Sequence, residues 1–204
     1  MSTQLFRPRF HVDECLEEIR ECLEKGWTGL GFKTVEFEEA WKAYTGLPNA
    51  HYLNSATAGL HLALNIYRLE VITTPITFVS TNHAIMYENL TPVFADVDQY
   101  LCLDPDDVAR KITPRTRAVM FVGIGGNTGQ LARVAEICRE HDLILILDAA
   151  HLSGSKLEGK DPGLLADVAV YSFQAVKNMP TGDSGMICFK APELDAFARR
   201  QSWL

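Results

Sequence analysis

Short apolar runs alternate with helical patterns along most of the chain, and this alternation limits the possible fold more than any other feature. The clearest apolar runs span residues 118–122, 143–147, 167–171 and 185–189. Each run has the length and composition of a buried strand. Strands that alternate with helices predict an α/β fold of three layers, in which a mostly parallel sheet carries helices on both faces.

Capping residues and helix breakers predict the remaining elements. Asp13 is a plausible N-cap for an amphipathic helix over residues 13–25, and Thr34 for a second helix that runs to Tyr44. Asp104 followed by proline predicts a short helix to residue 111. We also expect strands at 51–53, 72–74 and 92–95, and helices at 60–64, 81–87, 129–141 and from 193 onwards.

Length, charge and hydropathy restrict the class of protein. A chain of 204 residues fits one large domain, or one and a part. Its net charge of -7 argues against nucleic acid or an anionic membrane as the main partner. No apolar run approaches the ~20 residues of a membrane span, and no apolar segment typical of a signal peptide follows Arg7 and Arg9. We therefore expect a cytoplasmic protein.

The cysteines predict neither disulfides nor a metal site. The chain has 5 of them, scattered and without a C-x-x-C pair. Cys15 and Cys22 stand seven residues apart and can share a helix face, but two thiols without further ligands make a poor metal site. All five are expected to be reduced thiols in the core.

The strongest candidate for chemistry is Lys177, in a loop of small polar residues beyond the strand at 167–171. A lysine alone is usually a solvated surface cation. Asp148, however, directly follows the strand at 143–147, and the carboxyl ends of parallel strands meet at one edge of a sheet. A pyridoxal phosphate (PLP) site needs an amine for a Schiff base and a carboxylate for the pyridinium nitrogen, and these two residues supply both.

Two further segments suit the same interpretation. Small residues at 54–59, among them Ser55, Ala56 and Thr57, join a strand to a helix, where free backbone N–H groups and the helix dipole favour a phosphate. Phe78 lies beyond the strand at 72–74. A phenylalanine is more often a core residue than one that stacks on a cofactor.

A rival interpretation rests on the glycines of residues 123–129. They follow a strand and precede a helix, and Asp148 ends the next strand about 20 residues later, as in a dinucleotide-binding unit. That pattern suggests an NAD(P)-dependent oxidoreductase. The glycine spacing is not the standard one, and this hypothesis leaves Lys177 and Ser55–Thr57 unexplained. A third hypothesis is a binding domain that keeps the fold without activity of its own.

Four runs together resemble a known family: residues 54–64, 75–81, 148–151 and 172–178 are similar to the DegT/DnrJ/EryC1/StrS sugar aminotransferases, PLP enzymes of fold type I. The resemblance extends from about residue 13 to the last residue. It implies PLP as cofactor, with Lys177 as the Schiff-base lysine and Asp148 as the partner of the pyridine nitrogen. Some relatives that dehydrate sugars carry histidine at the lysine position, so Lys177 favours amination.

The resemblance also implies roles for other residues and for partners. Phe78 matches the aromatic position stacked on the cofactor, and His151 a position near its phenolic oxygen. The phosphate-binding positions match Ala56, Thr57 and Ser172, and the expected cofactor site also includes Ser55 and Asn178. The expected substrates are glutamate as amino donor and a keto-sugar, nucleotide-linked, as acceptor. A homodimer is expected.

The sequence departs from the family pattern in places. Gln174 stands where many relatives carry histidine, and residues 123–126 differ from the usual His-x-Gly-Gly-like loop. The acidic or glycine turn that relatives place after the helix that begins near residue 60 is missing between Glu70 and Val71, so that helix is expected to run almost directly into its strand. Residues 1–33 are expected to form an N-terminal helix and loop and residues 34–204 the PLP-binding large domain, with the family's C-terminal small domain absent.

Overall fold

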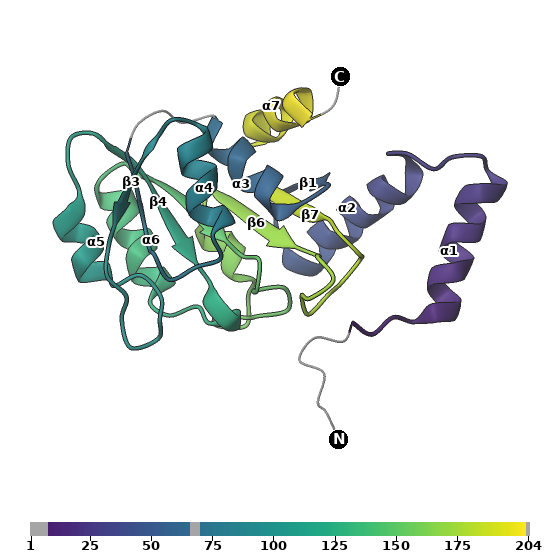
Figure 1. Cartoon of the computed structure of the whole chain (residues 1–204), viewed down its shortest axis with the longest axis horizontal. Coiled ribbons are helices and arrows are strands. Elements are labelled where there is room, and N and C mark those ends of the chain that lie inside the picture. The colour runs from purple at the N-terminus through teal and green to yellow at the C-terminus, as the bar shows by residue number, and fades with distance from the viewer. Residues whose placement is uncertain (1–7, 66–69, 203–204) are drawn as a thin grey trace.

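The computed structural model describes residues 8–65 and 70–202, and its elements are arranged around one mixed sheet (Figure 1). The strands are β1 (Asn49–Leu53), β2 (Glu70–Thr73), β3 (Thr91–Phe94), β4 (Thr116–Val122), β5 (Ile144–Asp148), β6 (Val168–Ser172) and β7 (Gly185–Phe189). The helices are α1 (Val12–Glu24), α2 (Phe32–Thr45), α3 (Ala56–Asn65), α4 (Ser80–Tyr87), α5 (Pro105–Lys111), α6 (Leu131–Glu140) and α7 (Pro192–Ser202). Two short 3-10 turns are η1 (Ile124–Gly126) and η2 (Pro162–Leu165).

The seven strands lie in the order β1-β7-β6-β5-β4-β2-β3. Strand β7 is antiparallel to both of its neighbours, β1 and β6, whereas the pairs from β6 to β3 are parallel. The carboxyl ends of six strands therefore lie at the same edge as the beginning of β7. This confirms the expected α/β sheet and creates the sheet edge at which ligands bind in such folds.

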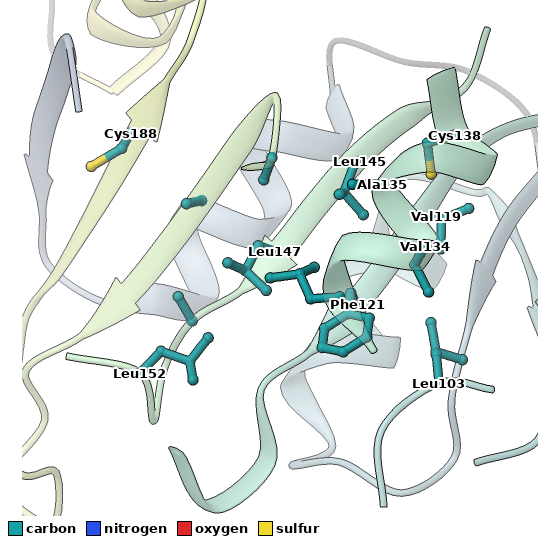
Figure 2. Packing of buried hydrophobic residues seen from close by; sticks show 14 of the residues in the cluster. Leu103, Val119, Phe121, Val134, Ala135, Cys138, Leu145, Leu147, Leu152 and Cys188 are labelled. Atoms are coloured by element: carbon teal, nitrogen blue, oxygen red, sulfur yellow. The ribbon is translucent and has the colours of Figure 1, made fainter. Parts of the chain in front are cut away.

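Alternate residues of the central strands bury two separate cores, one on each face of the sheet. On one face Val119, Phe121, Leu145 and Leu147 pack with residues of α2, α5 and α6. Figure 2 shows Val134 and other residues of α6 facing these strands. On the other face Met120 and other strand residues pack against α3, α4 and α7. The molecule is therefore three-layered, as predicted.

Two predictions for helix α1 were wrong: the position of its N-cap and the burial of its cysteines. Its N-cap is His11 rather than Asp13, and none of its residues is buried. In Figure 1 it stands apart from the sheet at the N-terminal end of the chain. The amphipathic pattern predicted a helix correctly, but Leu16, Ile19 and Leu23 of its apolar stripe stay exposed. For the same reason the prediction that all cysteines are core thiols was wrong for Cys15, which is exposed, and for Cys22, which is half-buried.

Smaller differences concern element ends. Helix α2 begins at Phe32 with Gly31 as N-cap, and Thr34 instead lies in its first turn, where its hydroxyl accepts the Gly31 N–H. The predicted cap of α5 is correct, because the Asp104 side chain accepts the N–H of Asp106. The junction between α3 and β2, where the turn is predicted to be missing, includes residues 66–69, which lie outside the described residues.

Within the described ranges, no helix is both long and apolar enough to cross a membrane.

Candidate active site

The sheet edge that gathers the strand carboxyl ends opens into a cavity of about 860 Å³. Its walls come from the ends of β1, β2, β4, β5 and β6 and the segments that follow these strands. The segment after β6 includes Asp183, near the start of β7. Eight of the residues singled out in the sequence line it: Ser55, Ala56, Thr57, Phe78, Asp148, His151, Ser172 and Lys177. Segments more than 100 residues apart in the chain thus share one site.

Helix α3 presents its N-terminus to this cavity. Ser55 caps the helix, because its side-chain oxygen accepts the N–H of Ala58 at 3.2 Å and its carbonyl accepts that of Gly59 at 3.3 Å. The preceding N–H groups of Ala56 and Thr57 have no acceptor in an earlier turn. Together with the helix dipole they form a binding place for an anion such as a phosphate.

Gly185 allows β7 to begin directly against the start of α3. A Cβ atom at this position would lie 2.5 Å from the backbone nitrogen of Ala56 and 2.6 Å from the carbonyl carbon of Ser55. These are backbone atoms, so they cannot turn aside as the end of a side chain can. A residue other than glycine would therefore displace the anion-binding turn.

Asp148 ends β5 as a buried carboxylate with 5% of its surface exposed. Its Oδ2 accepts the hydroxyl of Thr81 at 2.7 Å and its Oδ1 accepts the N–H of Ala150 at 3.1 Å. Burial raises the pKa of Asp148, and these two hydrogen bonds and the charges of His151 and Lys177 oppose that effect. No ion pair to Asp148 occurs in residues 8–65 and 70–202, so this part of the chain leaves a buried acid free to pair with a cationic partner.

Lys177 lies in the loop between β6 and β7 and is half-buried. Its own N–H donates to the carbonyl of Gln174 at 2.8 Å, which holds the backbone in a tight turn beside the cavity. Burial lowers the pKa of the Lys177 amine, and the charge of Asp148 opposes this to a lesser extent. A lowered pKa increases the uncharged, nucleophilic fraction of an amine.

His151 is oriented by the glycine loop after β4. The N–H of Gly125 donates to His151 Nδ1 at 3.1 Å. A backbone N–H can only donate, so Nδ1 carries no proton and the neutral ring has its hydrogen on Nε2. Burial and the charge of Lys177 lower the pKa of His151, which keeps the ring neutral. The side chain thus offers one hydrogen-bond donor, Nε2–H.

Of the two remaining residues predicted for the cofactor site, one lines the cavity and the other does not. Phe78 lines the cavity and is 66% exposed, so it belongs to neither core. Asn178 is exposed, does not line the cavity, and uses its side-chain amide to donate to the carbonyl of Ser153. The cavity therefore gathers the predicted residues without Asn178.

Sequence reasoning missed the roles of Thr81 and Gly185. A threonine at the start of a helix is normally interpreted as a capping residue, so its bond to a distant acid leaves no sequence signal. Gly185 did carry a signal, because a glycine at the first position of a strand often marks a close backbone approach.

The residues of the cavity suit PLP. A buried carboxyl group with no ion pair in the described part of the chain suits a protonated ring nitrogen, a half-buried amine suits a carbonyl, and the start of α3 suits a phosphate. The glycines of residues 123–129, by contrast, do not open a helix as a dinucleotide motif requires. Helix α6 begins only at Leu131, after the 3-10 turn η1.

Comparison with protein families identifies the chain. The model of the DegT/DnrJ/EryC1/StrS aminotransferase family matches residues 11–202. This chain belongs to that family. The membership confirms the resemblance carried by the four sequence runs. Members of the family bind PLP or its amine form PMP.

Individual members extend this result. The chain is 38% identical over 207 residues to dTDP-4-dehydro-2,3,6-trideoxy-D-glucose 4-aminotransferase of Saccharopolyspora spinosa, covering 98% of this chain and 53% of the relative. The crystal structure of the aminotransferase TlmJ from Streptoalloteichus hindustanus matches with a TM-score of 0.93 and 37% identity, covering 98% of this chain and 56% of that one. NtdA from Bacillus subtilis, solved with bound PMP, matches with a TM-score of 0.86 and 26% identity, covering 92% and 43%.

These likenesses confirm the fold-type-I large-domain architecture of the sugar aminotransferases. They also show a difference in length, because the chain spans about half the length of the curated relatives it matches.

Proposed function

We propose that this chain binds PLP through Lys177 and takes part in moving an amino group from glutamate to a nucleotide-linked keto-sugar. The observation that carries the proposal is the pairing of Lys177, an amine whose pKa is lowered by burial, with Asp148, a buried acid, in one cavity at the sheet edge. Within the described residues the acid has no ion pair, so its charge is available to a bound cation.

Each wall of the cavity has a part in this proposal. Bound PLP supplies a carbonyl carbon that reacts with amines and a ring that accepts electrons. Asp148 accepts the ring N–H and holds that proton in place. The half-buried amine of Lys177 would hold the cofactor at its carbonyl carbon and, when free, would serve as the base that takes up and returns a proton. The start of α3 and the Ser172 hydroxyl would hold the phosphate, and Phe78, which lines the same cavity, would lie against the ring.

His151 completes the set as a neutral donor. Its Nε2–H is the group that would meet the phenolic oxygen of the cofactor, because Gly125 already occupies Nδ1. A neutral donor next to that oxygen stabilises its negative charge without adding a second cation beside Lys177.

The substrates are proposed from relatives. The Saccharopolyspora spinosa enzyme is named for a dTDP-linked keto-sugar, which supports a nucleotide-linked acceptor. Glutamate and a homodimer follow from the family resemblance. We propose that residues 34–204 form the PLP-binding unit, and that a further part, of the kind the longer relatives possess, completes the sugar site.

Trapping of the cofactor tests the lysine directly. PLP is added to the full chain, the absorbance of bound cofactor is recorded, and the complex is reduced with borohydride and mapped by peptide mass spectrometry. We expect the adduct on Lys177 and none in Lys177→Ala. Lys160→Ala, which removes an exposed lysine, is the matched control and keeps the adduct. An adduct on another lysine would exclude the assignment.

Amino transfer is tested with ¹⁵N-labelled glutamate and a dTDP-linked keto-sugar, with sedimentation equilibrium on the same sample for the homodimer. Labelled amino-sugar is the expected product. Adduct formation without transfer would favour the hypothesis of a binding domain without activity of its own. Preferential binding of a nicotinamide dinucleotide would favour the oxidoreductase instead.

A further inference from the structure

Asp148, the buried acid of the cavity, is hydrogen-bonded to a chain of two hydroxyl groups, those of Thr81 and Thr77, from the segment that follows β2. Thr77 Oγ1 lies 2.7 Å from Thr81 Oγ1, and Thr81 Oγ1 lies 2.7 Å from Asp148 Oδ2. Thr81 is fully buried in the first turn of α4, and Asp148 is buried at the end of β5. The contact therefore joins two elements that are 67 residues apart in the chain.

The direction of these hydrogen bonds follows from the number of protons. Each hydroxyl has one hydrogen to donate, and an ionised carboxylate can only accept. When Asp148 is ionised, Thr81 therefore gives its hydrogen to the carboxylate, which leaves Thr81 only lone pairs for Thr77. Thr77 must be the donor in the second bond. Donation by Thr77 polarises the Thr81 hydroxyl and strengthens its bond to the acid.

We propose that Thr81 is a positioning residue for Asp148, and that Thr77 supports it through this directional chain of hydroxyl groups. The inference rests on the proposed PLP function and deepens it. Thr81 fixes one carboxylate oxygen while the Ala150 N–H fixes the other, so the two bonds together stop the carboxylate from rotating. Each oxygen keeps a further lone pair for a donor in the cavity.

The Asp148 carboxylate needs such support because burial and neighbouring charges both affect its charge and orientation. Burial favours its uncharged form, and a protonated acid cannot hold a cationic ring nitrogen. In the described residues, the titratable groups whose charges act on it are His151 and Lys177, and the charge of the Lys177 amine attracts the same carboxylate. A neutral hydroxyl stabilises the charged acid without competing as an ion pair. The branched side chain of threonine also restricts its rotation, so the hydroxyl is held in place.

Three variants of the full chain separate the roles. Thr81→Val keeps the shape and removes the hydroxyl, Thr81→Ser restores the hydroxyl, and Thr77→Val removes only the supporting bond. The first readout is the NMR titration of the Asp148 carboxyl carbon without added cofactor. We expect the highest titration midpoint in Thr81→Val, an intermediate one in Thr77→Val, and the wild-type midpoint in Thr81→Ser.

The second readout is the affinity for PLP. Loss of one hydrogen bond to a charged group should weaken binding about tenfold or more in Thr81→Val, and serine should rescue it. If Thr81→Val does not fold, the graded effect of Thr77→Val still tests the chain of hydroxyls.

The two proposals fail in different ways. An unchanged Asp148 titration in both valine variants would overturn the role of Thr81, whether or not PLP binds. If wild-type chain forms no adduct on Lys177, the proposed function fails, and the titration still reports the hydroxyl chain.

Discussion

At the scale of single residues, Gly185 makes the sharpest stability prediction. Gly185→Ala puts a Cβ atom 2.5 Å from the backbone nitrogen of Ala56, which cannot move without shifting the first turn of α3. We expect a loss of about 1–3 kcal/mol in the free energy of unfolding, together with weaker phosphate binding. Urea denaturation and inhibition of PLP binding by inorganic phosphate measure the two effects.

Gly29→Ala is the matched control for this change, because an added Cβ there meets no atom within 4 Å. It should leave both measurements at the wild-type values. If Gly185→Ala behaves like the control, the close approach of β7 and α3 is not needed for the anion site.

The residues of the candidate site were predictable to the extent that their position relative to a strand end decides their role. Asp148 and Ser172 end strands and Lys177 follows one, so the parallel sheet brings them to one edge. Asn178 is next to Lys177 in the chain but bonds to the Ser153 carbonyl, outside the cavity. That choice depends on how two loops pack, and neither loop has a periodic pattern that predicts it.

At the scale of elements, the sequence predicted where the strands lie along the chain better than which strands are adjacent in the sheet. Each apolar run became a strand, because burial on both faces leaves a continuous apolar signal. The position of β7 between β1 and β6 was not predictable, since strand order depends on contacts far apart in sequence. The caps of α1 and α2 were misplaced because the residues at these positions, His11 and Gly31, make no side-chain capping bond, so the capping signals of Asp13 and Thr34 pointed two to three residues too far along the chain.

Helix α7 is held to the body by a charge cluster in which Glu38 and His51 are buried and Arg199 is exposed, and this cluster predicts a response to pH. Arg199 donates to Glu38 Oε2 at 3.0 Å and to the carbonyl of Ala50 at 2.7 Å, and His51 bonds to Glu38 Oε1 at 3.2 Å. Burial alone would raise the pKa of Glu38, but the hydrogen bonds from His51, the Tyr52 N–H and Arg199 outweigh it and lower the pKa.

Because the pKa of Glu38 is lower in the folded chain, its contribution to stability is present above the ordinary carboxyl pKa of 4.5 and is lost as the pH falls through the folded value. Glu38→Gln should lose about 1–2 kcal/mol at pH 7 and show a smaller further loss at acid pH than wild type. Urea denaturation from pH 7 down to about pH 2 measures this, because the loss lies below the ordinary carboxyl pKa. Glu39→Gln, an exposed neighbour on α2, should keep the wild-type pH dependence.

Substitutions in helix α1 are expected to change the free energy of unfolding much less than substitutions in the core. Leu16 and Ile19 are 54% and 55% exposed, so Leu16→Ala with Ile19→Ala should change the free energy of unfolding by less than about 0.5 kcal/mol per substitution. Leu145→Ala, in the core beneath α6, should cost about 2–5 kcal/mol. Urea denaturation compares them. A large loss from the α1 variants would mean that its apolar stripe is covered in solution.

At the scale of the whole molecule, the cavity couples ligand binding to the stability of the sheet and not to α1. Its walls join α3, α4 and the ends of the central strands, so a ligand that binds only the folded chain must stabilise these elements together. At a PLP concentration about 100 times its dissociation constant, the gain is about 2.7 kcal/mol. Thermal unfolding should show a higher Tm with PLP, and hydrogen exchange should slow in the core strands but not in α1.

Variants of the two central residues decide whether this gain comes from the proposed contacts. Lys177→Ala removes the covalent attachment and Asp148→Asn removes the charge that meets the ring nitrogen, so each should lose most of the PLP-dependent rise in Tm. Both keep the cavity walls, so the unloaded variants should unfold cooperatively as wild type does. If PLP raises the Tm of both variants as much as that of the wild type, PLP stabilises the molecule from another place on its surface. The adduct map would then locate that place.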